Sequence, residues 1–69
     1  MANTNEAADQ IEENIASLNN SLDNLNKILE ILEEGGTEDT TALKDNIKGM
    51  EEIIATNLRT VEYIRETAI

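Results

Sequence analysis

The sequence predicts an all-α protein: an antiparallel two-helix coiled-coil hairpin that dimerises into a four-helix bundle. Leucine and isoleucine recur at alternating steps of four and three before a Gly35-Gly36 pair, and the same rhythm resumes after it. This spacing places the apolar side chains along one stripe of each helix. The chain contains no proline that would break either segment. A single helical hairpin over residues 1–69 therefore accounts for the whole pattern.

The first helix is expected over about residues 4–34. Asn3 and Glu6 have the spacing of a capping box, in which the two side chains bind early backbone N–H groups. Gly35 is expected to take the left-handed conformation that ends a helix. The seam residues, at heptad positions a and d, are Ile11, Ile15, Leu18, Leu22, Leu25, Leu29 and Leu32.

A turn over about residues 35–40 leads to a second helix over about residues 41–68. Asp39 or Thr40 is expected to be its N-cap, because both side chains can accept a hydrogen bond from an early backbone N–H. The seam continues through Leu43, Ile47, Met50, Ile54, Asn57, Val61, Ile64 and Ala68. The two helices are nearly equal in length, as a hairpin requires.

Antiparallel packing places an a residue of one helix beside a d residue of the other. With the expected turn, the pairing runs from Leu32 with Ile47 to Ile11 with Ala68 in one constant register. A shorter turn would slip this register by about one helical turn. The sequence therefore predicts the hairpin but leaves its register open.

Large hydrophobic residues also lie outside the seam, with Ile28 and Ile53 at position g and Leu58 at position e. Left in water, they would form a contiguous apolar patch, and such patches usually mark interfaces. A two-fold dimer of hairpins would bury them. We expect Ile28, Ile53, Leu58 and Asn57 to lie at this interface, with the Asn57 amide setting register or oligomeric state, or else contacting a ligand inside the bundle.

Three further residues on the outer surface have alternative explanations. Ile31 and Tyr63 are either scattered surface hydrophobes or the edge of a partner site. Gly49 is either a tolerated exposed glycine or a point where another helix or a partner approaches the backbone closely. The sequence does not choose between these readings.

The composition argues against an enzyme and against a cofactor or metal site. The chain has no cysteine and no histidine, and its only aromatic residue is one tyrosine. Disulfides are thereby excluded, a structural zinc site is not expected, and the usual nucleophiles and bases of catalysis are missing. Adjacent carboxylates such as Glu12 and Glu13 diverge by about 100° on a helix and do not converge on one ion. A small chain without such staples is expected to be stabilised by oligomerisation.

The net charge of −10 comes mainly from the first helix. Glu12, Glu13, Glu30 and Glu33 are candidates for an acidic docking surface, and we expect a protein partner with a basic surface. The same charge repels phosphate backbones and anionic lipid, so direct binding of nucleic acid or membrane is not expected. The chain also lacks an apolar run of membrane-spanning length and a basic, apolar leader, so we expect a cytoplasmic protein.

These observations favour a small, acidic, non-enzymatic interaction module that acts as a homodimer, either an adaptor, an inhibitor or an assembly chaperone. The alternative is a structural part of a larger scaffold. A mimic of nucleic acid is an acidic variant of the first hypothesis. In outline the hairpin resembles the Rop family of plasmid regulators, which dimerise into four-helix bundles and bind RNA through basic residues. That resemblance implies a dimer and an RNA partner, whereas the charge of this chain opposes contact with phosphate.

Overall fold

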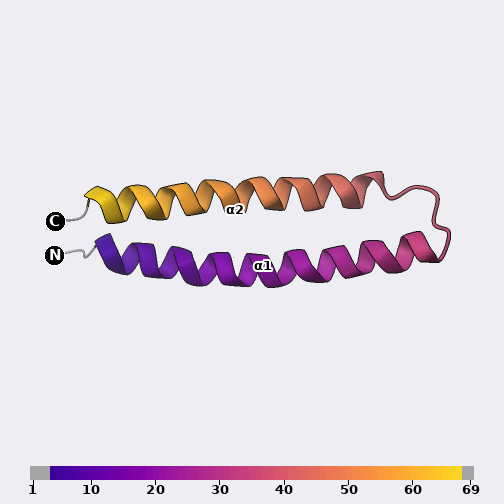
Figure 1. The fold of residues 1–69 in the computed structure, drawn as a ribbon, viewed down its shortest axis with the longest axis horizontal. Coiled ribbons are helices and arrows are strands. Elements are labelled where there is room, and N and C mark those ends of the chain that lie inside the picture. Colours follow the sequence, from indigo (N-terminus) through magenta and orange to yellow (C-terminus); the bar gives the residue numbers. More distant parts are fainter. Residues whose placement is uncertain (1–3, 68–69) are drawn as a thin grey trace.

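The structure is a computed structural model and describes residues 4–67. It consists of two helices, α1 (Thr4–Glu34) and α2 (Thr41–Thr67), that run antiparallel and pack against each other along their length (Figure 1). The predicted all-helical hairpin is therefore confirmed. The molecule is a thin rod with extents of 54 × 15 × 14 Å. The start of α1 and the end of α2 lie side by side, at the opposite end of the rod from the turn.

Helix α1 ends in a Schellman motif formed by the glycine pair. The Gly36 N–H donates to the Glu33 carbonyl at 3.1 Å, and the Thr37 N–H donates to the Leu32 carbonyl at 3.0 Å. This pattern places the left-handed residue at Gly36, whose φ is +80°. The prediction that Gly35 takes this conformation is thus wrong by one residue. The predicted N-cap of α1, Asn3, lies outside the described residues.

The start of helix α2 is capped by the backbone of Thr40 and the side chain of Asp39. The Thr40 carbonyl accepts the first helical hydrogen bond, from the Lys44 N–H at 3.0 Å, which makes Thr40 the N-cap by its backbone. The Asp39 carboxylate accepts a hydrogen bond from the Thr41 N–H at 3.1 Å. The side chain that accepts a hydrogen bond from a free backbone N–H of the first turn therefore belongs to the residue before the N-cap.

The core follows the expected seam. Ala8, Ile15, Ile54 and Val61 are buried together, and half-buried seam residues from both helices pack against them. No large side chain within residues 4–67 is fully buried, because two helices alone cover each other on one side only. The seam thus holds the hairpin together but leaves much of each helix in water.

The register of the pairing differs from the expected one. Pairing Ile11 with Ala68, which itself lies outside the described residues, would leave Ala8 uncovered and Thr40 in the open turn. Instead Ala8 is 0% exposed and Thr40 is buried. At the turn, α1 runs on past the start of α2, while the free ends are level (Figure 1). These observations indicate a register shifted by one heptad, with Ala8 beside Ile64 and Leu32 beside Thr40.

The rod exposes more surface than a compact protein of its size. Its radius of gyration is 16.1 Å, against about 11 Å for a compact chain of this length. Its accessible surface is 5315 Å², against about 4,300 Å² for a compact monomer of 7.6 kDa. The isolated hairpin therefore leaves roughly 1,000 Å² of extra surface in water.

Candidate functional site

The charged residues of the two helices occupy only three of the seven heptad positions. Each Asp, Glu, Lys and Arg of α1 and α2 falls at b, e or f, and none falls at g or c. The uncharged positions on α1 are Ala7, Gln10, Asn14, Ser17, Ser21, Asn24, Ile28 and Ile31. Those on α2 are Ala42, Asn46, Gly49, Ile53, Thr56, Thr60, Tyr63 and Thr67. With 29% charged residues in the chain, about five of these sixteen positions would carry charge if exposed faces were alike.

Both uncharged stripes lie on the same side of the rod. Arg65 of α2 and Glu12 of α1 are both at position e, and their hydrogen bonds show that the e flanks of the two helices meet on one side of the seam. In an antiparallel pair the g flanks then meet on the other side. Together the g and c residues form one surface along the rod, which we call the uncharged face.

Within residues 4–67, four of the five exposed large hydrophobic residues belong to the uncharged face. Ile28 is 46% exposed and Ile31 is 67% exposed on α1, while Ile53 is 53% exposed and Tyr63 is 67% exposed on α2. The structure thus places on one side residues that the sequence analysis treated separately: Ile28 and Ile53 of the expected interface, the two edge residues Ile31 and Tyr63, and Gly49. The signal that could have joined them is the absence of charge at g and c.

A shallow depression interrupts the uncharged face near the middle of α2. It has a volume of about 290 Å³ and is lined by Gly49, Glu52, Ile53, Thr56 and Asn57. A Cβ at Gly49 would meet no atom within 4 Å, so nothing inside the hairpin requires glycine there. The missing side chain instead opens the depression beside Ile53.

Leu58 does not share this surface with the other expected interface residues. At about 100° per residue, Leu58 lies about 20° from Arg65 around α2, whereas Ile53 lies about 120° from it. Leu58, 46% exposed, is therefore on the e flank beside the ion pairs. Asn57 is half-buried at the seam and reaches the edge of the depression. A single flat interface takes in Ile28, Ile53 and Asn57 but not Leu58.

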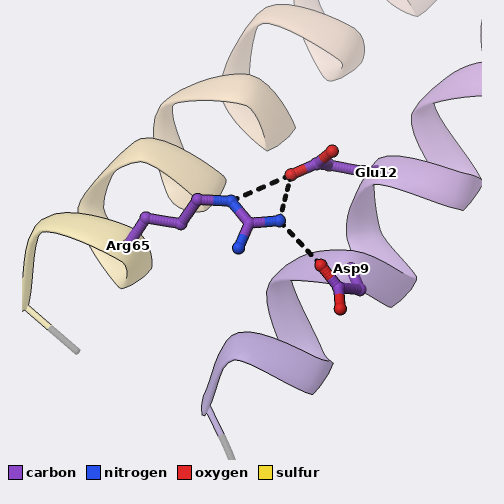
Figure 2. Close-up of polar contacts among 3 residues, drawn as sticks. All are labelled: Asp9, Glu12 and Arg65. Carbon is purple, nitrogen blue, oxygen red and sulfur yellow. Dashed lines mark hydrogen bonds and ion pairs between the residues drawn. The ribbon is translucent and has the colours of Figure 1, made fainter. Parts of the chain in front are cut away.

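The e flank carries a charged cluster that crosses the hairpin. The Arg65 guanidinium donates from Nε to Glu12 Oε1 at 3.0 Å and from Nη2 to Asp9 Oδ1 at 2.8 Å, and Nη2 also contacts Glu12 (Figure 2). The hydrogen bonds from Arg65 to Asp9 and then to Glu12 raise the pKa of Arg65 above its ordinary value. Glu12, which was expected to face a partner, is thus engaged by the opposite helix.

The other three acidic candidates lie away from this cluster. Glu13, Glu30 and Glu33 are exposed, and no ion pair within residues 4–67 involves them. They remain able to meet a basic surface. They are spread along α1 at positions f, b and e, so they present a charged flank and not a pocket.

The described part of the chain offers no arrangement for metal binding. Within residues 4–67 no group of His, Cys, Asp or Glu side chains is placed to hold an ion. In the same range, neither helix combines the length and apolar character needed to cross a bilayer. The features that stand out are the two contrasting outer surfaces.

Comparison with known proteins supplies no family for this chain. No protein-family model, curated protein or solved structure matches it. The outline shared with Rop hairpins therefore rests on architecture alone.

Proposed function

We propose that the protein is a small, non-enzymatic protein-interaction module that acts as a homodimer and docks onto a partner with a basic surface. The observation that carries this proposal is the division of its outer surface. One side has exposed isoleucines and no charge, and the remainder holds all the helical charges, with a strong acidic excess on α1. A protein that acted alone would have no need to exclude charge from one side.

The uncharged face supports the homodimer. Burying Ile28 and Ile53 removes apolar surface from water, and the g and c positions hold no charged residue that has to lose its hydration. The extra exposed surface of the rod also exceeds the roughly 800 Å² per partner that a stable interface typically buries. Self-association would give this short chain the core that two helices alone lack.

The exposed acidic residues of α1, here called the acidic flank, favour a partner with a basic surface. Glu13, Glu30 and Glu33 belong to a helix that has eight acidic residues and one lysine. A field of one sign steers an oppositely charged protein toward the surface and raises the association rate. Adaptors, inhibitors and assembly chaperones all act through such contacts, without chemistry of their own. The absence of cysteine and histidine from the sequence agrees with a non-catalytic role, and the absence of cysteine also agrees with the cytoplasm as the proposed compartment.

The test uses a partner captured by tagged protein from its native cell and then purified. Glu13→Lys, Glu30→Lys and Glu33→Lys together should slow association with that partner at least about tenfold at low salt, because steering is lost. The matched control reverses three acids on α2, Asp45→Lys, Glu62→Lys and Glu66→Lys, and should have a smaller effect. Equal rates for the wild type and the α1 variant would refute docking through the acidic flank.

A scaffold part is the second candidate, and the position of Leu58 favours it. Leu58 lies on the flank opposite Ile53, so the rod has a second exposed hydrophobic contact point. A scaffold would use both sides and grow beyond a dimer. Sedimentation over a wide range of concentrations separates the two functions: a constant dimer supports the module, whereas larger species that disappear with Leu58→Asp support the scaffold.

A further inference from the structure

We propose that the uncharged face binds a second copy of this chain in the antiparallel orientation, so that the turn of each copy lies at the open end of the other. The two-fold axis passes beside Ile53 of α2 and the middle of α1. This inference rests on the homodimer of the proposed function and assigns its surface and arrangement.

Charge identifies the occupant of this face as another copy. Two molecules that each carry −10 repel each other wherever acidic flanks meet. The g and c positions carry no charge, so contact on this side brings together fewer like charges than contact through the acidic residues of α1, with Glu52 left at the edge of the depression. A basic partner would find no acidic residue at the g and c positions, so a second uncharged stripe of the same length is the better match.

The g and c positions have the spacing of a seam. They recur at steps of three and four on both helices, just as a and d do. Where α1 packs antiparallel against α1 of the second copy, a g residue then meets a c residue, as a meets d inside the hairpin. The uncharged face can therefore form a second layer of helix packing parallel to the first.

The centre of this second seam is marked on α1 by a symmetric run of residues. Asn14, Ser17, Ser21 and Asn24 read the same in both directions about residue 19. A two-fold axis at this level places Asn14 opposite Asn24 of the second copy, and Ser17 opposite Ser21. Amides then meet amides and hydroxyls meet hydroxyls, so each donor finds an acceptor.

An exposed isoleucine of α2 lies at the same level of the rod as the centre of this run. In the register with Ala8 beside Ile64, Ile53 lies at the level of residue 19, where the symmetric run is centred. On α2 the same axis pairs g with g, because it places Ile53 against its own copy. It also places Gly49 opposite Asn57, the seam residue at the edge of the depression. The depression at Gly49 thus faces the partner helix where the two α2 helices come closest, and the absent Cβ permits that approach.

The hydroxyls of Thr60 and Thr67 on this face do not oppose burial. Thr60 Oγ1 donates to the Thr56 carbonyl at 3.0 Å, and Thr67 Oγ1 donates to the Tyr63 carbonyl at 2.8 Å. Because both hydroxyls are satisfied within α2, covering them leaves no donor unpaired.

Disulfide trapping tests the arrangement, because the chain has no cysteine of its own. Asn14→Cys and Asn24→Cys proteins, mixed and oxidised, should form a disulfide between residues 14 and 24 of different copies, identified by peptide mapping. Either variant alone should stay uncrosslinked, because like positions would lie about 15 Å apart along the rod. Asn20→Cys, at position f, is the control for random collision and should crosslink with neither.

Charge insertion tests the face. Thr56→Glu should raise the dimer dissociation constant at least about 100-fold in sedimentation, because it sets like charges near each other across the axis. Its neighbour Ala55→Glu, at position b, should leave the constant unchanged. A dimer that persists in both variants, or that never forms the 14–24 disulfide, overturns this arrangement and leaves the homodimer standing. A wild type that stays monomeric at all concentrations overturns the homodimer as well.

Discussion

Arg65, two residues before the end of the described chain, bridges back to Glu12 on the first turns of α1, 53 positions earlier in the sequence. This contact joins the e flanks of the two helices and so shows which side of the hairpin carries the uncharged g and c positions.

Exchanging the two charges tests the pair. Arg65→Glu should lower the melting temperature at low salt, because it places a third acid beside Asp9 and Glu12. Adding Glu12→Arg should restore most of the loss, since the opposite charges meet again. Thermal melts in low and high salt measure both effects, and the difference should shrink in high salt because these groups are exposed. A double variant no more stable than Arg65→Glu would contradict the contact.

Ala8 reports the register of the pairing. Replacing this fully covered residue by leucine should destabilise the hairpin by about 1–3 kcal/mol, because the added side chain has no space against α2. Ala16→Leu, at an exposed position of the same helix, is the control and should change stability little. Denaturant unfolding measures both. An unchanged stability for Ala8→Leu would contradict this register and favour the one that pairs Ile11 with Ala68.

The Asp39 cap makes stability depend on pH. The backbone N–H of Thr41, and then its side chain, donate hydrogen bonds to the Asp39 carboxylate and lower the pKa of Asp39. Because the pKa of Asp39 is lower in the folded state, its ionisation stabilises the fold at pH values above the ordinary pKa of about 3.9. This contribution disappears as the pH falls through the folded-state pKa.

Asp39→Asn keeps a side-chain acceptor but does not titrate, so it isolates this ionisation from the other carboxylates. The wild type should melt above Asp39→Asn at pH 7, and the difference should vanish as the pH falls below about 4 and through the folded-state pKa of Asp39. A difference that is the same at all pH values would show that the charge of Asp39 contributes nothing.

Gly49→Ala separates the needs of the hairpin from those of the dimer. Alanine favours a helix by about 1 kcal/mol over glycine, and a Cβ at this position meets nothing within the hairpin. In a Thr56→Glu background, Gly49→Ala should therefore stabilise the monomer. In the otherwise native chain it should weaken association, because the methyl group occupies the space for the partner helix. A variant that stabilises the monomer and tightens the dimer would show that no backbone comes close to Gly49.

The sequence by itself determined the secondary structure and the seam. A heptad of leucine and isoleucine, interrupted only by two glycines and a short polar turn, suits two helices packed along one stripe and no other simple fold. The acids at b, e and f and the missing charges at g and c are also written in the sequence. Whether the uncharged positions of the two helices form one surface depends on which flanks lie on the same side of the rod.

The tertiary structure decided the register, the left-handed glycine and the grouping of the outer residues. A heptad pattern matches itself again after every slip of one repeat, so the seam alone cannot tell Ile11 beside Ala68 from Ala8 beside Ile64. The path of the turn over the end of α1 made that choice. Two adjacent glycines are equally able to take a positive φ, and hydrogen bonds to Glu33 and Leu32 selected the second. Leu58 and Ile53 lie on opposite sides of the rod, because antiparallel packing places e beside e on one side and g beside g on the other. This relationship exists only once the helices are packed.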